Sequence, residues 1–169
     1  MKVQKILVPV DFSDHAQQAL QWGADLAEKY GAQILLLHVL LKAVEEVFAE
    51  ASTWEDIPAY YYEGMNRSYH PHYKEPIIID LVDGAQTQLD DLACRELKES
   101  VTRQAKVAVG KPPDEILRVA HEEGADLIVM GTHGRTGLRH VLLGSVAEAV
   151  VRTAPCPVFT IRAGAPVSR

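Results

Sequence analysis

The strongest constraint on the fold is a repeated alternation between short apolar runs and longer segments with helical periodicity. The runs are rich in aliphatic and β-branched residues and lack the polar alternation of a strand with one solvated face. Such runs are typical of parallel strands buried on both faces, with helices as the crossovers. They read KILVPV, AQILLLHVL, AKVAVG, ADLIVMG and PVFTIR. We therefore expect an α/β fold: a doubly wound, Rossmann-like, five-stranded parallel sheet with helices on both faces.

Local signals mark where the helices begin and end. Ser13 is placed to cap a helix in which small and apolar residues recur every three to five positions, and Gly31 provides its stop. A Pro-Pro pair and a glycine bracket a later helix in the same way. The further helices are expected at 86–100, 114–123 and 145–153.

Residues 50–84 interrupt this alternation. Five of the six tyrosines of the chain lie in this segment. A connection of this length inside a compact domain is uncommon and often carries function. We expect one domain over residues 1–169 with this segment as an insertion. Two interpretations of it stay open: a lid or partner surface, and a tolerated surface insertion.

The charge balance limits the classes of partner. The formal net charge is −6, which disfavours broad contact with nucleic acid or with an anionic membrane. No apolar run reaches the roughly 20 residues of a spanning helix, and the run near the start is too short for a secretion signal. Cys94 and Cys156 lack a pairing motif, and we expect unpaired, packed thiols in a reducing compartment. We therefore expect a cytoplasmic protein that binds neither nucleic acid nor a membrane.

A glycine-rich segment, GTHGRTGLRHVLLGS at residues 131–145, follows the fourth apolar run. In open parallel sheets, ligands bind beyond the carboxyl ends of the strands, where the strand order reverses. Glycines let the backbone approach a ligand, and Gly144-Ser145 opens a helix whose free N–H groups favour phosphate. His133 and Arg135 are among the side chains that make the segment locally positive when protonated. The segment predicts a polyphosphate site; the alternative is that its glycines only form tight turns.

The same segment argues against several kinds of catalysis. It lacks the P-loop lysine, which disfavours the usual kinase or motor ATPase machinery. Ser145 lacks the G-x-S-x-G elbow of a nucleophilic serine, so we assign no catalytic residue. Elsewhere, His70 and His72 are too few for a metal site without an acidic or cysteine partner at matching spacing, so we assign no metal ligand.

The spacing Gly131-x2-Gly134-x9-Gly144-Ser145 resembles the nucleotide-binding signature of the universal stress protein family. The stretches VPVDFS, LLLHV and VGKPPDEI resemble other landmarks of that family, in the same order. The resemblance covers the chain except the insertion and the last few residues, and the spacing is that of the ATP-binding subgroup. It implies a fold of the adenine nucleotide alpha hydrolase-like type with ATP as ligand, and it allows magnesium or manganese with the nucleotide.

The resemblance also implies positions around the nucleotide. Asp11 would lie near the ribose or a bound metal, Pro9 beside the adenine, and the backbone of Val39 at the adenine edge. Met130 and Gly131 would border the base and the ribose. Backbone or hydroxyl groups would reach the phosphates from Gly134, Gly144, Ser145 and Val146.

Pairing through the last strand is a further implication of the resemblance. A homodimer would form through Val158, Phe159, Thr160 and Ile161. The leading hypothesis is a stress-response regulatory protein with an unidentified protein partner, in which ATP acts as a conformational ligand and is hydrolysed slowly at most. Two alternatives stay open: a nucleotide-dependent hydrolase or adenylyl-type transferase, and an interaction module that uses the tyrosine-rich insertion without nucleotide.

Overall fold

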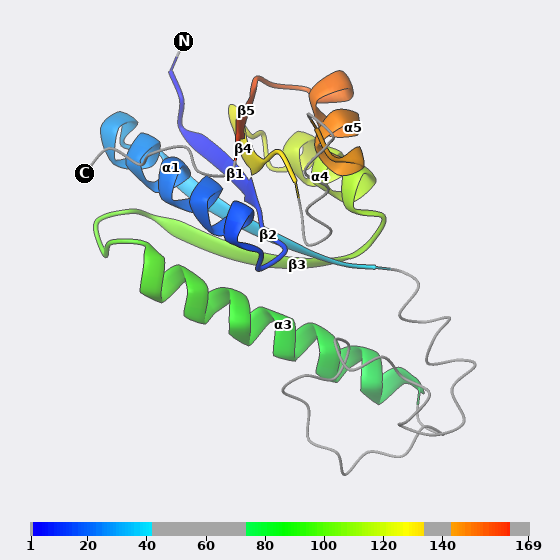
Figure 1. Cartoon of the computed structure of the whole chain (residues 1–169). Helices are drawn as coiled ribbons and strands as arrows, with labels where there is room; N and C mark the ends of the chain where they lie inside the picture. Colours follow the sequence, from blue (N-terminus) through cyan, green and yellow to red (C-terminus); the bar gives the residue numbers. More distant parts are fainter. Residues whose placement is uncertain (1, 42–73, 134–142, 163–169) are drawn as a thin grey trace.

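Five strands form one sheet in the order β3-β2-β1-β4-β5, and every neighbouring pair is parallel (Figure 1). The computed structural model describes residues 2–41, 74–133 and 143–162. The strand order confirms the predicted doubly wound five-stranded parallel sheet. The strands are β1 (Lys5–Pro9), β2 (Gln33–Leu41), β3 (Arg103–Gly110), β4 (Leu127–Gly131) and β5 (Val158–Ile161).

Helices cover both faces of the sheet in the described part of the chain. They are α1 (Asp14–Tyr30), α3 (Lys74–Glu96), α4 (Pro112–Glu122) and α5 (Ser145–Thr153). The helices α1 and α3 share one hydrophobic core with the sheet, and α4 and α5 share the other. This arrangement confirms the expectation of helices on both faces.

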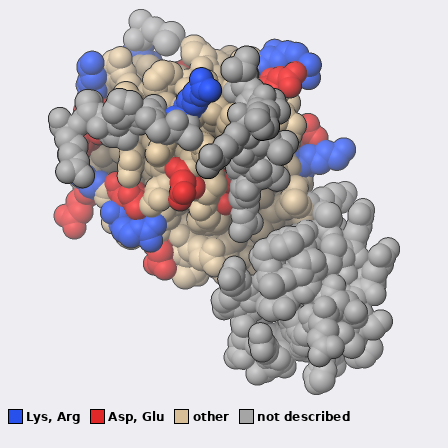
Figure 2. Space-filling model, viewed as in Figure 1, with Lys and Arg blue, Asp and Glu red and all other residues tan. Residues whose placement is uncertain are grey.

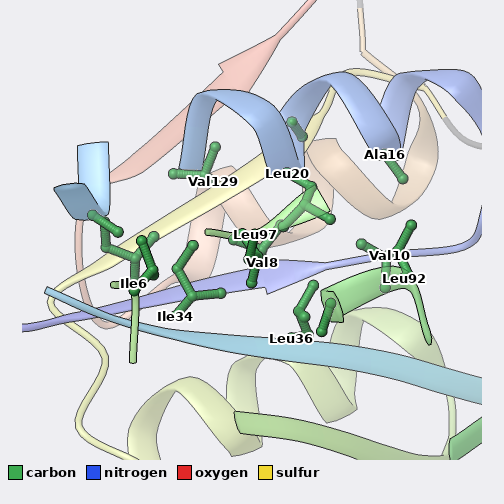
Figure 3. Close-up of a cluster of buried hydrophobic side chains, with 14 of the residues drawn as sticks. Ile6, Val8, Val10, Ala16, Leu20, Ile34, Leu36, Leu92, Leu97 and Val129 are labelled. Atoms are coloured by element: carbon green, nitrogen blue, oxygen red, sulfur yellow. The ribbon is translucent and has the colours of Figure 1, made fainter. Parts of the chain in front are cut away.

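Successive residues of the central strands supply the two cores in turn. Ile6 and Val8 of β1 lie in the core under α1 and α3, in one cluster with Leu20 and Leu92 (Figure 3). Leu7, between them, belongs to the core under α4 and α5. Because both faces are covered, these strands need apolar residues at every position, and each fully buried aliphatic side chain contributes about 1.5–3 kcal/mol.

The ends of three helices follow the local signals. The Ser13 hydroxyl accepts a hydrogen bond from the backbone N–H of Ala16, and Gly31 ends α1 with a φ of 63°. Gly124, with a φ of 64°, follows α4, and α5 spans the predicted residues.

The helix α3 differs from its prediction, because it begins at Lys74 rather than 86 and ends at Glu96 rather than 100. The apolar stripe continues one turn further back, since Leu81 and Ala85 are buried in line with Leu89. Gly84 lies within this helix, where glycine costs only about 1 kcal/mol relative to alanine. The last part of the predicted insertion is therefore helical.

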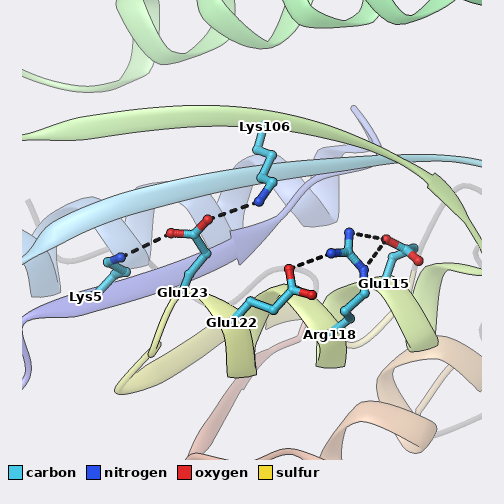
Figure 4. Close-up of polar contacts among 6 residues, drawn as sticks. All are labelled: Lys5, Lys106, Glu115, Arg118, Glu122 and Glu123. Atoms are coloured by element: carbon cyan, nitrogen blue, oxygen red, sulfur yellow. Dashed lines mark hydrogen bonds and ion pairs between the residues drawn. The ribbon is translucent and has the colours of Figure 1, made fainter.

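Charged side chains tie the elements together at the surface (Figure 4). Glu123, just after α4, bonds Lys106 of β3 at 3.0 Å and Lys5 of β1 at 3.3 Å, and these contacts hold the pKa of its carboxyl below the usual value. Arg118 bonds Glu115 at 2.6 Å one turn away on α4. Positive and negative side chains are interspersed among the described residues on the face shown in Figure 2.

Two further expectations are tested by the described residues. Neither cysteine is in a disulfide, but Cys94 is exposed, so the prediction of a packed thiol was wrong for it. Cys156 is half-buried, and burial raises the pKa of its thiol. None of the helices within the described ranges is long and apolar enough to span a bilayer.

Candidate functional site

The switch point of the sheet lies between β1 and β4. The chain leaves β1 toward β2 on one side, whereas β4 lies on the other side of β1. Their ladder consists of Ile6 with Leu127 and Leu7 with Ile128, although β1 continues to Pro9 and β4 to Gly131. The carboxyl ends of the two strands are therefore unpaired with each other, as at the ligand-binding crevice of doubly wound folds.

At the end of β1, the Asp11 carboxylate is held against the start of α1. Its Oδ1 accepts hydrogen bonds from the Ser13 N–H at 3.1 Å and the Ser13 hydroxyl at 2.5 Å. Phe12, between them, has a φ of 62°, a left-handed conformation that makes the turn tight. Asp11 is half-buried in this turn.

A second set of contacts fixes the end of β1 to β2. The His38 Nδ1–H donates to the Val10 carbonyl oxygen at 2.8 Å, and the Val10 N–H donates to the Leu37 carbonyl oxygen at 2.8 Å. The Phe12 ring lies against the His38 ring with centroids 4.7 Å apart. The turn that presents Asp11 is thus supported from the neighbouring strand.

At the end of β4, Thr132 connects three segments. Its N–H donates to the Ile161 carbonyl oxygen of β5 at 2.9 Å, and its carbonyl oxygen accepts from the Gly144 N–H at 2.8 Å. These two bonds bring the start of α5 against the end of β4. Thr132 is buried, with 6% of its surface exposed.

Gly131 is closely surrounded at the same place. A Cβ atom there would lie 3.0 Å from the Cβ of His15 and 3.2 Å from the carbonyl oxygen of His133. Such distances are shorter than ordinary van der Waals contact, so the approach of β4 to α1 requires glycine at this position.

The first turn of α5 carries backbone N–H donors that the helix itself does not use. Gly144 is its N-cap residue, in an extended conformation, and no side chain caps this end. The first N–H groups of any helix have no partner within the helix, and the positive end of the helix dipole lies there. Ser145 is exposed at this end, whereas Glu148 in the first turn opposes an anion. Backbone donors of this kind are suited to binding an anion such as phosphate.

The structure places most of the predicted site residues at this edge of the sheet. Pro9, Asp11, Met130, Gly131 and His133 lie at or just after the ends of β1 and β4; Gly144, Ser145 and Val146 lie at the start of α5; and Val39 lies near the end of β2. The Met130 side chain is in the core, with 5% exposed, so only its backbone is available. Gly134, Arg135, His70 and His72 lie outside the described residues, as does the part of the insertion before Lys74.

Two neighbours of the site were missed from the sequence. Thr132 links the end of β4 to α5, and the His15 ring lies 5.9 Å from that of His133. His15 lies four residues after Asp11, at the end of α1 that meets the carboxyl edge of the sheet. This position in the sequence could have identified His15 as a neighbour of the site.

The sequence profile of the universal stress protein family matches residues 2–162 of the chain. The chain belongs to the universal stress protein family. It is 31% identical over 161 residues to the universal stress protein MJ0577 of Methanocaldococcus jannaschii, and the match covers 94% of each chain. These findings confirm the resemblance drawn from the glycine spacing.

Solved structures of universal stress proteins share the fold. The structure of MJ0577 superposes with a TM-score of 0.75 at 26% identity, over 98% of this chain and 100% of that one. A universal stress protein from Archaeoglobus fulgidus in complex with dAMP gives 0.58 at 24% identity, over 95% and 98%. Another universal stress protein, in complex with cAMP, gives 0.56 at 22% identity, over 96% and 98%.

Proposed function

We propose that this universal stress protein binds ATP as a regulatory ligand, with the nucleotide setting its conformation. The observation that carries the proposal is the meeting of three features at the switch point: the held carboxylate of Asp11, the closely packed Gly131 and the uncapped start of α5. The family members in complex with dAMP and cAMP support an adenine nucleotide as the class of ligand.

The geometry suggests how the nucleotide would be oriented. The adenine would lie toward β2, near Pro9 and Val39, with the ribose near Asp11. The phosphates would accept hydrogen bonds from the first N–H groups of α5, where the helix dipole favours negative charge. The Ser13 contacts already hold the Asp11 carboxylate in place, so its orientation is set before the ligand arrives.

A regulatory role fits the described groups better than rapid catalysis. They are mainly backbone donors, which bind a phosphate in its ground state as well as during reaction, and such binding alone does not accelerate hydrolysis. Hydrolysis is therefore expected to be slow at most. No group of three or more His, Cys, Asp or Glu residues in the described ranges is arranged to hold a metal, so magnesium or manganese would arrive with the phosphates.

We also propose a homodimer through β5 in the cytoplasm, with a further protein as the regulated partner. β5 is a terminal strand of the described sheet, and Phe159 on it is 41% exposed. Val151 on the neighbouring α5 is 45% exposed. An edge strand bordered by exposed apolar side chains favours pairing with a second copy.

The first test is mass spectrometry of any nucleotide released when freshly purified protein is denatured. Stripped protein is then titrated with Mg-ATP by calorimetry and assayed for multiple turnover. We expect saturable binding with little turnover. Rapid turnover would favour the enzyme, and the absence of any adenine nucleotide binding would refute the proposal.

Gly144→Val tests the phosphate position. The conformation of Gly144 (φ −68°, ψ 159°) suits valine, but a Cβ would lie 3.3 Å from the Thr132 carbonyl oxygen, which is closer than ordinary contact. The backbone must therefore shift by a few tenths of an ångström, and urea unfolding checks that the fold is kept. The added side chain would stand where the phosphate is expected, and we predict at least about tenfold weaker ATP binding, or about 1.4 kcal/mol. Gly84→Val, on the exposed side of α3, is the control and should leave the affinity unchanged.

A further inference from the structure

Two histidines from distant parts of the chain meet at the phosphate end of the proposed site. His15 lies in the first turn of α1 and His133 follows β4, and their ring centroids are 5.9 Å apart with the planes tilted by 52°. Both residues are half-buried. The close packing around Gly131 joins the two segments, so the meeting of these rings, hereafter the histidine pair, follows from the fold.

The histidine pair is also connected to the start of α5. The His133 Nδ1 lies 3.0 Å from the Thr132 hydroxyl oxygen. The carbonyl oxygen of Thr132 accepts the hydrogen bond from the Gly144 N–H. One imidazole of the pair is thus oriented by the residue that positions the phosphate-binding turn.

We propose that His15 contacts the phosphates of the nucleotide and that the histidine pair takes up a proton when the nucleotide binds. The inference rests on the proposed function and extends its site by one residue. Two imidazolium rings this close would repel each other. A phosphate beside them offsets that repulsion and favours the charged form. Binding is then linked to proton uptake.

Among the described residues on neighbouring elements, the charged groups are mostly negative. Asp11 ends β1, Asp14 begins α1, and Glu148 lies in the first turn of α5. Arg162 directly follows β5. These carboxylates repel phosphate. Protonation of the histidine pair on binding would offset that repulsion. Side chains that stay neutral could not compensate the phosphate charge in this way.

Calorimetry in buffers of different ionisation enthalpy measures this proton uptake directly. Mg-ATP is titrated near pH 7 into the full chain and into His15→Gln and His133→Gln. The nucleotide's own titration is common to all samples, so the difference between variants reports on the protein. On binding Mg-ATP, the parent should take up at least about 0.3 proton more than His15→Gln does. Between pH 8 and pH 6, the ATP affinity of the parent should also rise about 3- to 10-fold more than that of His15→Gln.

His121→Gln is the matched control, because His121 is an exposed histidine in the last turn of α4. It should behave as the parent. Adenosine, which lacks phosphate, should bind the parent and His15→Gln equally; a parallel loss of adenosine binding would show a structural role and overturn the inference. Equal proton uptake by the parent and His15→Gln would overturn it too, while leaving ATP binding intact. A parent that binds no adenine nucleotide would overturn both proposals.

Discussion

Gly131→Ala should destabilise the protein and weaken nucleotide binding together. Its φ is outside the left-handed region, so backbone strain adds nothing and the effect comes from contact. The new Cβ would lie 3.0 Å from the His15 Cβ and 3.2 Å from the His15 carbonyl carbon and the His133 carbonyl oxygen. Two of these three atoms are backbone, so the first turn of α1 or the segment after β4 must shift. Overpacking of this kind costs about 1–3 kcal/mol.

Urea unfolding measures this loss as a lower free energy of unfolding. In a thermal melt, each 1 kcal/mol lost corresponds to a Tm lower by about 2–4 °C for a domain of this size. The shift would also displace Asp11 and His15, so ATP affinity should fall by about tenfold or more, equivalent to about 1.4 kcal/mol. Gly84→Ala is the matched control, because a Cβ there has nothing within 4 Å and the residue lies inside α3. It should stabilise the protein by about 0.5–1 kcal/mol with unchanged affinity. If Gly131→Ala is as stable as the parent and binds ATP equally, the argument from close packing is wrong.

Three further predictions concern stability and assembly. Asp126 Oδ2 accepts from the Gln4 N–H at 2.8 Å and the Lys5 N–H at 3.0 Å, and these bonds lower the pKa of the Asp126 carboxyl below its unfolded value. The stability that the ionised carboxylate contributes is therefore present above about pH 4 and is lost as the pH falls through the folded pKa. In urea unfolding, Asp126→Asn should lower the free energy of unfolding by about 1–2 kcal/mol at pH 7 and by less at pH 3. Leu20→Ala, at a fully buried site, should cost about 2–5 kcal/mol, and a loss below 1 kcal/mol would contradict the assigned core. Phe159→Lys should give a folded monomer by analytical ultracentrifugation, whereas an unchanged dimer would place the interface elsewhere.

The strands and three of the helices could be predicted because their signals are local. Five apolar runs without polar alternation indicated parallel strands, and the alternation with helices indicated the doubly wound topology. Ser13 and Gly31 bounded α1 because capping depends on a few neighbouring residues. The predicted start of α3 was wrong, because burial of Leu81 and Ala85 on the sheet extends the helix past Gly84 and outweighs the intrinsic preference of a single glycine.

The candidate site was predictable only to the extent that it lies at strand ends. Asp11 follows β1 and Gly131 ends β4, so their placement at the same edge of the sheet follows from parallel topology. The roles of Thr132 and His15 depend on contacts between distant segments, which periodicity does not encode. The packing of Met130 into the core likewise depends on which face of β4 meets α5.

The proposed phosphate site shows how an acidic chain can bind an anion without a broad basic surface. Near the switch point, the described carboxylates of Asp11, Asp14 and Glu148 oppose a polyphosphate. The N–H groups of α5 are fixed partial charges that need no counterion, but they act only over a short distance. They can therefore bind phosphate only if the backbone comes very close, which is what Gly131 permits at α1 and the Thr132–Gly144 hydrogen bond enforces at α5. Nucleotide affinity in this protein should consequently depend more on small backbone displacements at these positions than on its net charge.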